Sequence, residues 1–206
     1  MTKKFELTDE TKSWFGHALF RIRALVSFGI VVEGELGGWV EKEENLSHEG
    51  LAWIFGQAQI SGEARISGEA QISGEARIFG EAQIFGQAQI FGQAQISGQA
   101  QISGQARIYG QARVQKTRDY LEITPIGSEN GVFTAYRTAQ DVQCNRGCFH
   151  GTLAEFEEAV TKTHGDNEYA KQYQAVVALV RLRFGLHIGV NAEIATNVES
   201  EKVTEA

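Results

Sequence analysis

The middle of the chain repeats one pattern of large, small and polar residues every six positions. Isoleucine opens each unit, and Ser, Phe or Tyr, then Gly, Glu or Gln, Ala, and Gln or Arg follow. The isoleucines are Ile54, Ile60, Ile66, Ile72, Ile78, Ile84, Ile90, Ile96, Ile102 and Ile108, and Val114 opens an incomplete unit. A period of six does not fit a helical turn of about 3.6 residues, but it spans three strand alternations. The pattern therefore predicts short strands with Ile and Ala inward and the second, fourth and sixth places outward.

These units resemble the hexapeptide repeats of left-handed parallel β-helix proteins, in which three units close one triangular coil. The resemblance covers residues 54–113. It implies a mainly β fold of about 3.3 coils, with residues eighteen apart stacked above one another. At the fourth place, Glu gives way to Gln after Glu81, so amide ladders replace stacked carboxylates that would repel one another.

The second place of the unit carries aromatic residues that are expected to point outward. Phe79, Phe85 and Phe91 fall in successive units and form a belt, which Phe55 and Tyr109 extend along one face. Outward aromatic residues in a cluster indicate a contact surface. We predict that these five residues form an interface between the copies of a homotrimer, the common state of such β-helices. The alternative is a docking surface for another protein.

The predicted β-helix lacks the residues that β-helix enzymes use. Related acyltransferases employ a histidine as general base, and γ-type carbonic anhydrases bind zinc through three histidines. Residues 54–113 contain no His, Cys, Asp or Thr. We therefore predict no catalytic residue, no metal site and no cofactor there. A transferase that uses the C-terminal region instead is kept as an alternative.

The flanking segments are expected to close the open ends of the coil, whose unpaired strand groups would otherwise stack on other chains. Residues 1–53 predict a β cap, with an apolar stretch over 18–26. Its Gly-Gly-Trp-Val at 37–40 and Asn-Leu-Ser at 45–47 resemble the lead-in of hexapeptide-repeat proteins from phages and prophages. Residues 54–114 would then form the β-helix itself.

Residues 119–184 predict a small α+β domain. Strands are expected over 120–126 and 131–137, with a shorter one over 142–144. Thr152 with Glu155 forms a capping box that opens a helix, Gly165 can end it, and Asp166 or Asn167 can cap a second helix. Gly-Cys-Phe-His-Gly-Thr-Leu at 147–153 resembles a C-terminal module of phage and prophage proteins. Residues 185–206 are expected to be a flexible acidic tail.

Polar residues of this domain form a candidate ligand site. An arginine beside turn amides and a helix N-terminus suits a phosphate or a nucleotide. Such turn residues also commonly cap the backbone, which is the structural alternative. The candidate ligand residues are Ser128, Asn130, Arg137, Asn145, Arg146, His164 and Asn167.

The two cysteines and two nearby histidines allow other chemistry. Cys144, Cys148, His150 and His164 would together offer four zinc ligands, but Cys-x3-Cys-x-His is not a standard zinc spacing. Cys148 with either histidine would form a nucleophile and base pair. The structural alternative is that Cys148 and Phe149 pack under the first helix, and we predict neither a metal nor a catalytic residue.

Charge and composition restrict the partners. The net charge is −7, but residues 54–113 are neutral, with four Glu and four Arg. Without a basic stripe, binding to duplex nucleic acid is not expected. No apolar run approaches the roughly 18 residues of a membrane span, and the N-terminus lacks the apolar core of a secretory signal. Two cysteines do not form a disulfide framework, so we expect a protein of the reducing cytoplasm.

These observations together predict a non-enzymatic, homotrimeric binding or assembly protein. The resemblance to phage proteins implies that it acts in the host cytoplasm and antagonises host defence, by sequestering a nucleotide signal or by covering a host protein. The alternatives are an acyl- or other transferase and a structural component of a virion or cytoskeleton.

Overall fold

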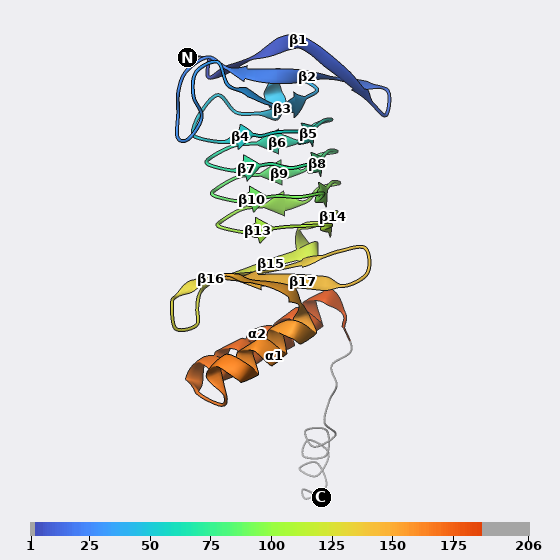
Figure 1. Ribbon diagram of the computed structural model, residues 1–206. Helices are drawn as coiled ribbons and strands as arrows, with labels where there is room; N and C mark the ends of the chain where they lie inside the picture. The colour runs from blue at the N-terminus through green and yellow to red at the C-terminus, as the bar shows by residue number, and fades with distance from the viewer. Residues whose placement is uncertain (1–2, 187–206) are drawn as a thin grey trace, which may run out of the picture.

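The protein is a column of stacked β-coils, with a β cap at one end and a sheet with two helices at the other (Figure 1). A computed structural model describes residues 3–186. The predicted fold class is thereby confirmed: a mainly β chain whose parallel β-helix lies between a β cap and a small α+β region. The expected tail lies outside the described residues from residue 187 onward.

Each coil consists of two-residue strands that pair in parallel with the strand eighteen residues further along, as Gln71 does with Gln89. The strands form three faces. The first face holds β5 (Gln59–Ile60), β8 (Arg77–Ile78), β11 (Gln95–Ile96) and β14 (Arg113–Val114). The second face holds β4 (Trp53–Ile54), β7 (Gln71–Ile72), β10 (Gln89–Ile90) and β13 (Arg107–Ile108). The third face holds β6 (Arg65–Ile66), β9 (Gln83–Ile84) and β12 (Gln101–Ile102).

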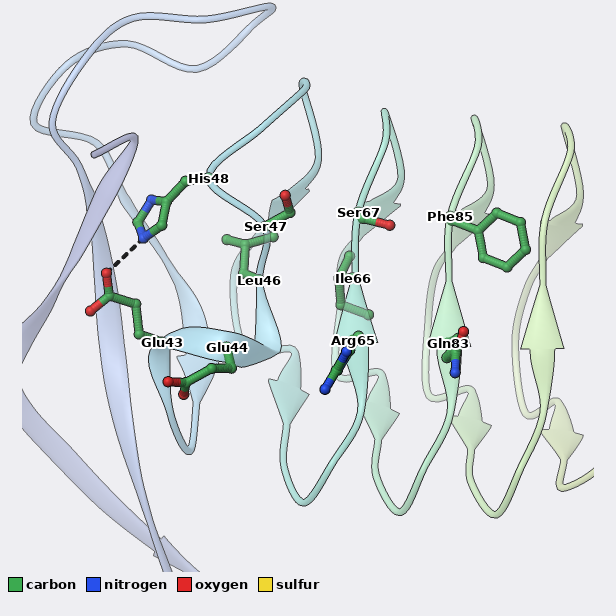
Figure 2. Close-up of a pocket in the computed structure, with 10 residues that line it drawn as sticks. All are labelled: Glu43, Glu44, Leu46, Ser47, His48, Arg65, Ile66, Ser67, Gln83 and Phe85. Carbon is green, nitrogen blue, oxygen red and sulfur yellow. Dashed lines mark hydrogen bonds and ion pairs between the residues drawn. The ribbon is translucent and has the colours of Figure 1, made fainter. Parts of the chain in front are cut away.

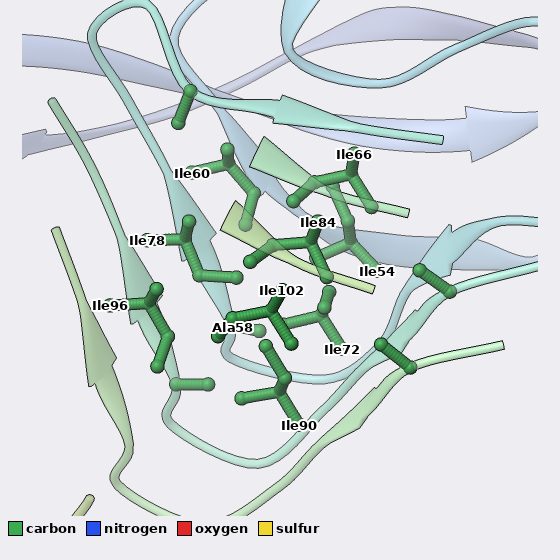
Figure 3. Close-up of a cluster of buried hydrophobic side chains, with 14 of the residues drawn as sticks. Ile54, Ala58, Ile60, Ile66, Ile72, Ile78, Ile84, Ile90, Ile96 and Ile102 are labelled. Atoms are coloured by element: carbon green, nitrogen blue, oxygen red, sulfur yellow. The ribbon is translucent and has the colours of Figure 1, made fainter. Parts of the chain in front are cut away.

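Isoleucine and alanine side chains fill the interior of the column (Figure 3). Every leading isoleucine from Ile54 to Ile108 and every alanine from Ala58 to Ala112 is at most 1% exposed, which confirms their predicted inward orientation. Burial of one isoleucine side chain contributes about 1.5–3 kcal/mol. Backbone hydrogen bonds connect the coils, as Ser73 N donates to Ile90 O at 2.9 Å.

Glycine at the third place lets the coils lie directly on one another. From Gly56 to Gly110 these residues have φ between +59° and +74°, a region that side chains disfavour. A Cβ on Gly74 would also lie 2.8 Å from the carbonyl oxygen of Gly92 and 2.9 Å from its nitrogen. The corner therefore requires glycine both for its backbone angle and for its closeness to the next coil.

The column begins earlier than the repeat indicates. In β3 (Leu36–Val40), Trp39 pairs with Gln59 and Val40 with Ile60, while Leu46 forms a bridge to Ile66. The coil thus starts inside the expected cap and makes about four turns. The first turn is not found by a search for six-residue repeats, because Ile54 follows Leu46 by eight positions rather than six.

Asn45, in the short 3-10 turn Glu43–Asn45, holds that first turn together without the Gly and Ala of the repeat. Its Nδ2 donates to the carbonyl oxygens of Gly62 and Ala64, and its Oδ1 accepts from the backbone N–H groups of Glu41 and Lys42. All hydrogen-bonding positions of this buried amide are satisfied.

The cap is a hairpin of β1 (Phe5–Trp14) and β2 (His17–Ala24), and β2 pairs with β3. The cap strands therefore continue the first face into one seven-stranded sheet. Lys4 covers the open end, because its Nζ donates to Ala52 O at 2.9 Å. Burial lowers the pKa of Lys4 to about 8. The far end of the hairpin reaches beyond the column (Figure 1), and we call its residues 12–17 the arm.

Side-chain ladders cover the outer corners. Gln105 donates to Gln87 at 3.2 Å, and Gln87 donates to Glu69 at 3.1 Å. Gln93 donates to Glu75 in the same way at the next corner. The predicted mixing of Gln with Glu thus gives Glu69, Glu75 and Glu81 an amide donor one coil away, whereas Glu63 pairs with Lys42.

The C-terminal region contains the antiparallel strands β15 (Tyr120–Ile126), β16 (Gly131–Arg137), β17 (Val142–Arg146) and β18 (Phe149–Thr152), preceded by the 3-10 turn Thr117–Asp119. Helices α1 (Leu153–His164) and α2 (Glu168–Phe184) pack on this sheet. The capping box of Thr152 and Glu155 is confirmed, and Asn167 caps α2. β18 was not predicted, because this four-residue strand contains Gly151 and directly precedes the helix. Among the described helices, none combines the length and apolar character needed to cross a membrane.

The corner glycines give a direct test of coil stacking. We expect Gly74→Ala to lower the free energy of unfolding by about 2–4 kcal/mol, because it adds both backbone strain and a contact with Gly92. Gly110→Ala is the matched control: its φ is +60°, but its Cβ would meet nothing within 4 Å. It should lose only about 1 kcal/mol. Chemical denaturation measures the free energy of unfolding of both variants. An equal decrease in the two variants would contradict the stacking explanation.

Candidate functional site

The C-terminal sheet separates the predicted ligand residues onto two sides. Adjacent residues of a strand face opposite sides of the sheet. In β17, Asn145 faces the end of the column, where its Nδ2 donates to Arg107 O at 2.7 Å. Arg146 faces the helices and lines a cavity beneath α1. The two residues therefore cannot share one ligand.

Three of the predicted residues, Ser128, Arg146 and His164, line one cavity of about 250 Å³. Ser128 comes from the β15–β16 turn, Arg146 from the end of β17 and His164 from the last residue of α1. Cys148, in the β17–β18 turn, lines the same cavity and is exposed. Segments distant in the sequence thus bring a hydroxyl, a guanidinium, an imidazole and a thiol to one place.

Packing and hydrogen bonds fix the guanidinium of Arg146. Its Nη2 donates to Ile126 O at 3.1 Å, and its Nη1 lies 3.6 Å from a carboxylate oxygen of Glu129. A Cβ on Gly131 would meet the guanidinium at 2.5 Å, so this glycine makes room for it. The Arg146 side chain is 10% exposed, whereas that of Glu129 is 80% exposed. The ion pair is therefore weak, and Arg146 remains the principal charge of the cavity.

Aromatic rings form the floor of the cavity. Tyr173 of α2 contacts Phe156 of α1 edge to face, with ring centroids 5.4 Å apart. The ring centroids of His164 and Tyr173 are 5.7 Å apart, and those of Phe149 and Phe156 are 5.3 Å apart. A cation beside an aromatic floor can bind a small anion that has a flat or apolar part.

The other four predicted residues serve the fold. Arg137 donates to Phe184 O at 2.9 Å, which ties β16 to the end of α2. Asn167 accepts from the backbone N–H groups of Tyr169 and Ala170 as the cap of α2. Asn130 occupies a turn at φ +49° and Asn145 binds the last coil. For these residues the structure shows the capping and packing roles that the sequence left as the alternative.

The cysteines and histidines do not form one cluster. Burial raises the pKa of Cys144 to about 12, so this thiol is not a nucleophile. His150 lies on the side of the sheet that faces the column, where it forms a hydrogen bond with the hydroxyl of Tyr136 at 3.0 Å. Within residues 3–186, no group of three His, Cys, Asp or Glu is placed to hold a metal ion. Only Cys148 and His164 share a cavity.

A second cavity, of about 570 Å³, lies beside the third face of the column (Figure 2). Ser47, Ser67 and Phe85 line its outer edge, and Arg65 and Gln83 lie along the face. Its histidine, His48, has both ring nitrogens engaged: Nδ1 accepts from Lys4 N at 3.1 Å and Nε2 contacts Glu43 at 2.7 Å. Lys3 and His48 lower the pKa of Glu43. This pair therefore holds the cap in place and has no free nitrogen to act as a base.

Most of the predicted aromatic belt makes contacts within the chain. Trp14 of the arm packs on Phe79, with centroids 5.5 Å apart. Phe91 stacks on Tyr109 at 5.3 Å, and Tyr109 in turn contacts His150. Phe55 packs partly against the core, whereas Phe85 is 39% exposed. The sequence did not indicate the arm, because nothing in a hairpin pattern shows which face its tip will cover.

Compared with known proteins, the chain matches no protein-family model and no curated protein sequence.

Proposed function

We propose that this is a non-enzymatic binding and assembly protein, in which the C-terminal region binds a small anion of nucleotide type at the end of a homotrimeric column. One observation carries the proposal: Ser128, Arg146 and His164 line the same cavity, although they come from three separate elements. Arg146 supplies the charge for a phosphate, and the hydroxyl and imidazole supply further hydrogen bonds.

The size of the cavity limits the ligand. Pockets for drug-sized molecules usually enclose about 300–1,000 Å³, and this one encloses about 250 Å³. It can hold a phosphate with a sugar or a single base, while the rest of a larger molecule would project outward. We therefore expect mononucleotides or cyclic nucleotides rather than long chains.

The same cavity gives weaker support to catalysis. An activated cysteine needs a base that a third group orients. Among the described residues, no side chain forms a hydrogen bond with the ring of His164, although its ring packs on Tyr169 and Tyr173. A thiol-dependent transferase through Cys148 is therefore the second candidate.

Self-association is proposed through the third face. Phe85 is the exposed member of the aromatic belt and lies beside the cavity of Figure 2. A trimer would display three C-terminal regions together, so that weak contacts act jointly. The phage origin, the host cytoplasm and the antagonism of host defence stay predictions from the family resemblance.

We expect a nucleotide to stabilise the protein and to protect Cys148. At a ligand concentration 100 times its Kd, stabilisation is about 2.7 kcal/mol, or a rise in Tm of about 5–10 °C. Iodoacetamide should then modify Cys148 more slowly, while buried Cys144 reports unfolding. Thermal shift with mononucleotides and cyclic nucleotides, and mass spectrometry of the alkylated protein, measure the two effects.

Ser128→Ala and His164→Ala should abolish most of the rise in Tm and most of the protection of Cys148. Arg118→Gln, at an exposed arginine of the same region, should leave the rise in Tm and the protection unchanged. If no nucleotide raises Tm or protects Cys148, the proposed ligand class is wrong. If instead an acyl donor is turned over and Cys148→Ser abolishes the turnover, the second candidate replaces the first.

Light scattering should give a mass three times that of the 22.7 kDa chain. Phe85→Ser should shift the protein toward monomer, and the column should tolerate it because Ser67 and Ser103 occupy the same place in the neighbouring coils. Leu179→Ser, on the exposed side of α2, is the control and should keep the mass unchanged. A monomer at all concentrations would contradict the proposed assembly.

A further inference from the structure

The arm and the first face of the column enclose a third cavity. The arm turns at Phe15 and Gly16, with φ of +47° and +84°, between the paired residues Trp14 and His17. The cavity measures about 640 Å³ and includes Ser61, Arg77, Phe79 and Gln95 on the column side. Its volume lies within the range of small-molecule sites. We call it the arm groove.

Three aromatic rings from two distant segments form the walls of the arm groove. Trp14 contacts Phe15 edge to face at 5.0 Å and meets Phe79 at 5.5 Å with the ring planes 59° apart. Phe15 is 85% exposed, and it has a left-handed backbone that a bulky residue seldom adopts. The chain thus holds a large apolar ring in solvent, at the mouth of a cavity that other rings line.

The charge near these rings decides which ligand they suit. Rings at steep angles, taken alone, are a common site for a cation. Arg77 lines this groove, however, and its Nε is buried without a hydrogen-bond partner among residues 3–186. Lys12 of the arm has its pKa lowered to about 8, by burial and then by the positive charges of Arg21 and Arg77.

The neighbouring acids do not compensate for this excess of positive charge. Glu10 pairs with Arg21 at 3.2 Å, and Glu41 pairs with His17 at 2.9 Å. In the described part of the chain, neither Lys12 nor Arg77 forms an ion pair. A cation would be repelled here, whereas an acidic group would relieve the repulsion between the two residues.

We propose that the arm groove is a second binding site, which takes a planar aromatic molecule carrying one acidic group. The aromatic part lies among Trp14, Phe15 and Phe79, and the acidic group meets Arg77. The site is independent of the cavity around Arg146, because α1 and β17, which line that cavity, lie at the opposite end of the column from the hairpin of β1 and β2 (Figure 1).

The repeat itself supplies conservative variants for the test. At the place of Phe79, the coils on either side carry Ser61 and Ser97, so Phe79→Ser restores a residue that the column already accepts. At the place of Arg77, they carry Gln59 and Gln95, so Arg77→Gln is equally compatible. Phe91→Ser and Arg65→Gln make the same changes on the other two faces and serve as controls.

The probe is 8-anilinonaphthalene-1-sulfonate, compared with N-phenyl-1-naphthylamine, which lacks the sulfonate. Fluorescence titration should show that the protein binds the sulfonate probe more tightly than the uncharged probe. Phe79→Ser should weaken the binding of both probes. Arg77→Gln should weaken the binding of the sulfonate probe alone, by about tenfold. Phe91→Ser and Arg65→Gln should bind both probes like the unmodified protein.

Two outcomes would overturn the proposal. In the first, Phe79→Ser and Arg77→Gln bind 8-anilinonaphthalene-1-sulfonate as tightly as the unmodified protein does, while circular dichroism shows that both variants are folded. In the second, the unmodified protein binds neither probe, and Phe15→Ser lowers the mass of the assembly in solution. A second copy of the chain would then fill the groove.

Discussion

The backbone of each coil lies directly against the backbone of the next, and this close stacking governs the rest of the molecule. It is possible only because a residue without a Cβ stands at each corner, as Gly74 does above Gly92. With the coils in contact, the amides of one strand bond the carbonyls of the next, and the isoleucines form one continuous core. A larger residue or an insertion at a corner would separate the coils on both sides.

Because of this constraint, the candidate binding cavities lie near the ends of the column. The walls carry mainly Gln, Glu and Arg, which bond one another along the corners. Cavities that combine a cation with an aromatic ring occur where the column meets irregular structure. One lies under α1, another beneath the arm, and a third, with Arg65 and Phe85, beside the cap. The column thus acts as a rigid spacer between two regions of irregular structure.

The sequence predicted what depends on local pattern and short spacing. The repeat identified the coil, and the capping box at Thr152 placed the start of α1 correctly. It could not show the first turn, where Asn45 replaces the Gly and Ala of the repeat by satisfying four backbone groups with one amide. Nor could it show the arm groove, because the contact of Trp14 with Phe79 spans 65 positions of the chain.

The candidate site was predicted in part for the same reason. Ser128, Arg146 and His164 stand in turns and element ends that meet, so a list of polar residues near turns included them. Strand alternation would have placed Asn145 on the opposite side from Arg146, had β17 been given its full length. Cys148 was considered as a metal ligand, as a nucleophile or as a residue packed under the first helix, and it lines the same cavity as the three residues.

Amide hydrogen exchange, measured residue by residue, tests the stacked column most directly. The amides of the second, fourth and sixth places bond carbonyls of the next coil, as those of Ser73, Glu75 and Gln71 do. They should exchange most slowly in the central coils, with protection falling toward both ends. Exchange as fast as that of the exposed turn at Phe15 and Gly16, or protection with a helical period, would contradict the account.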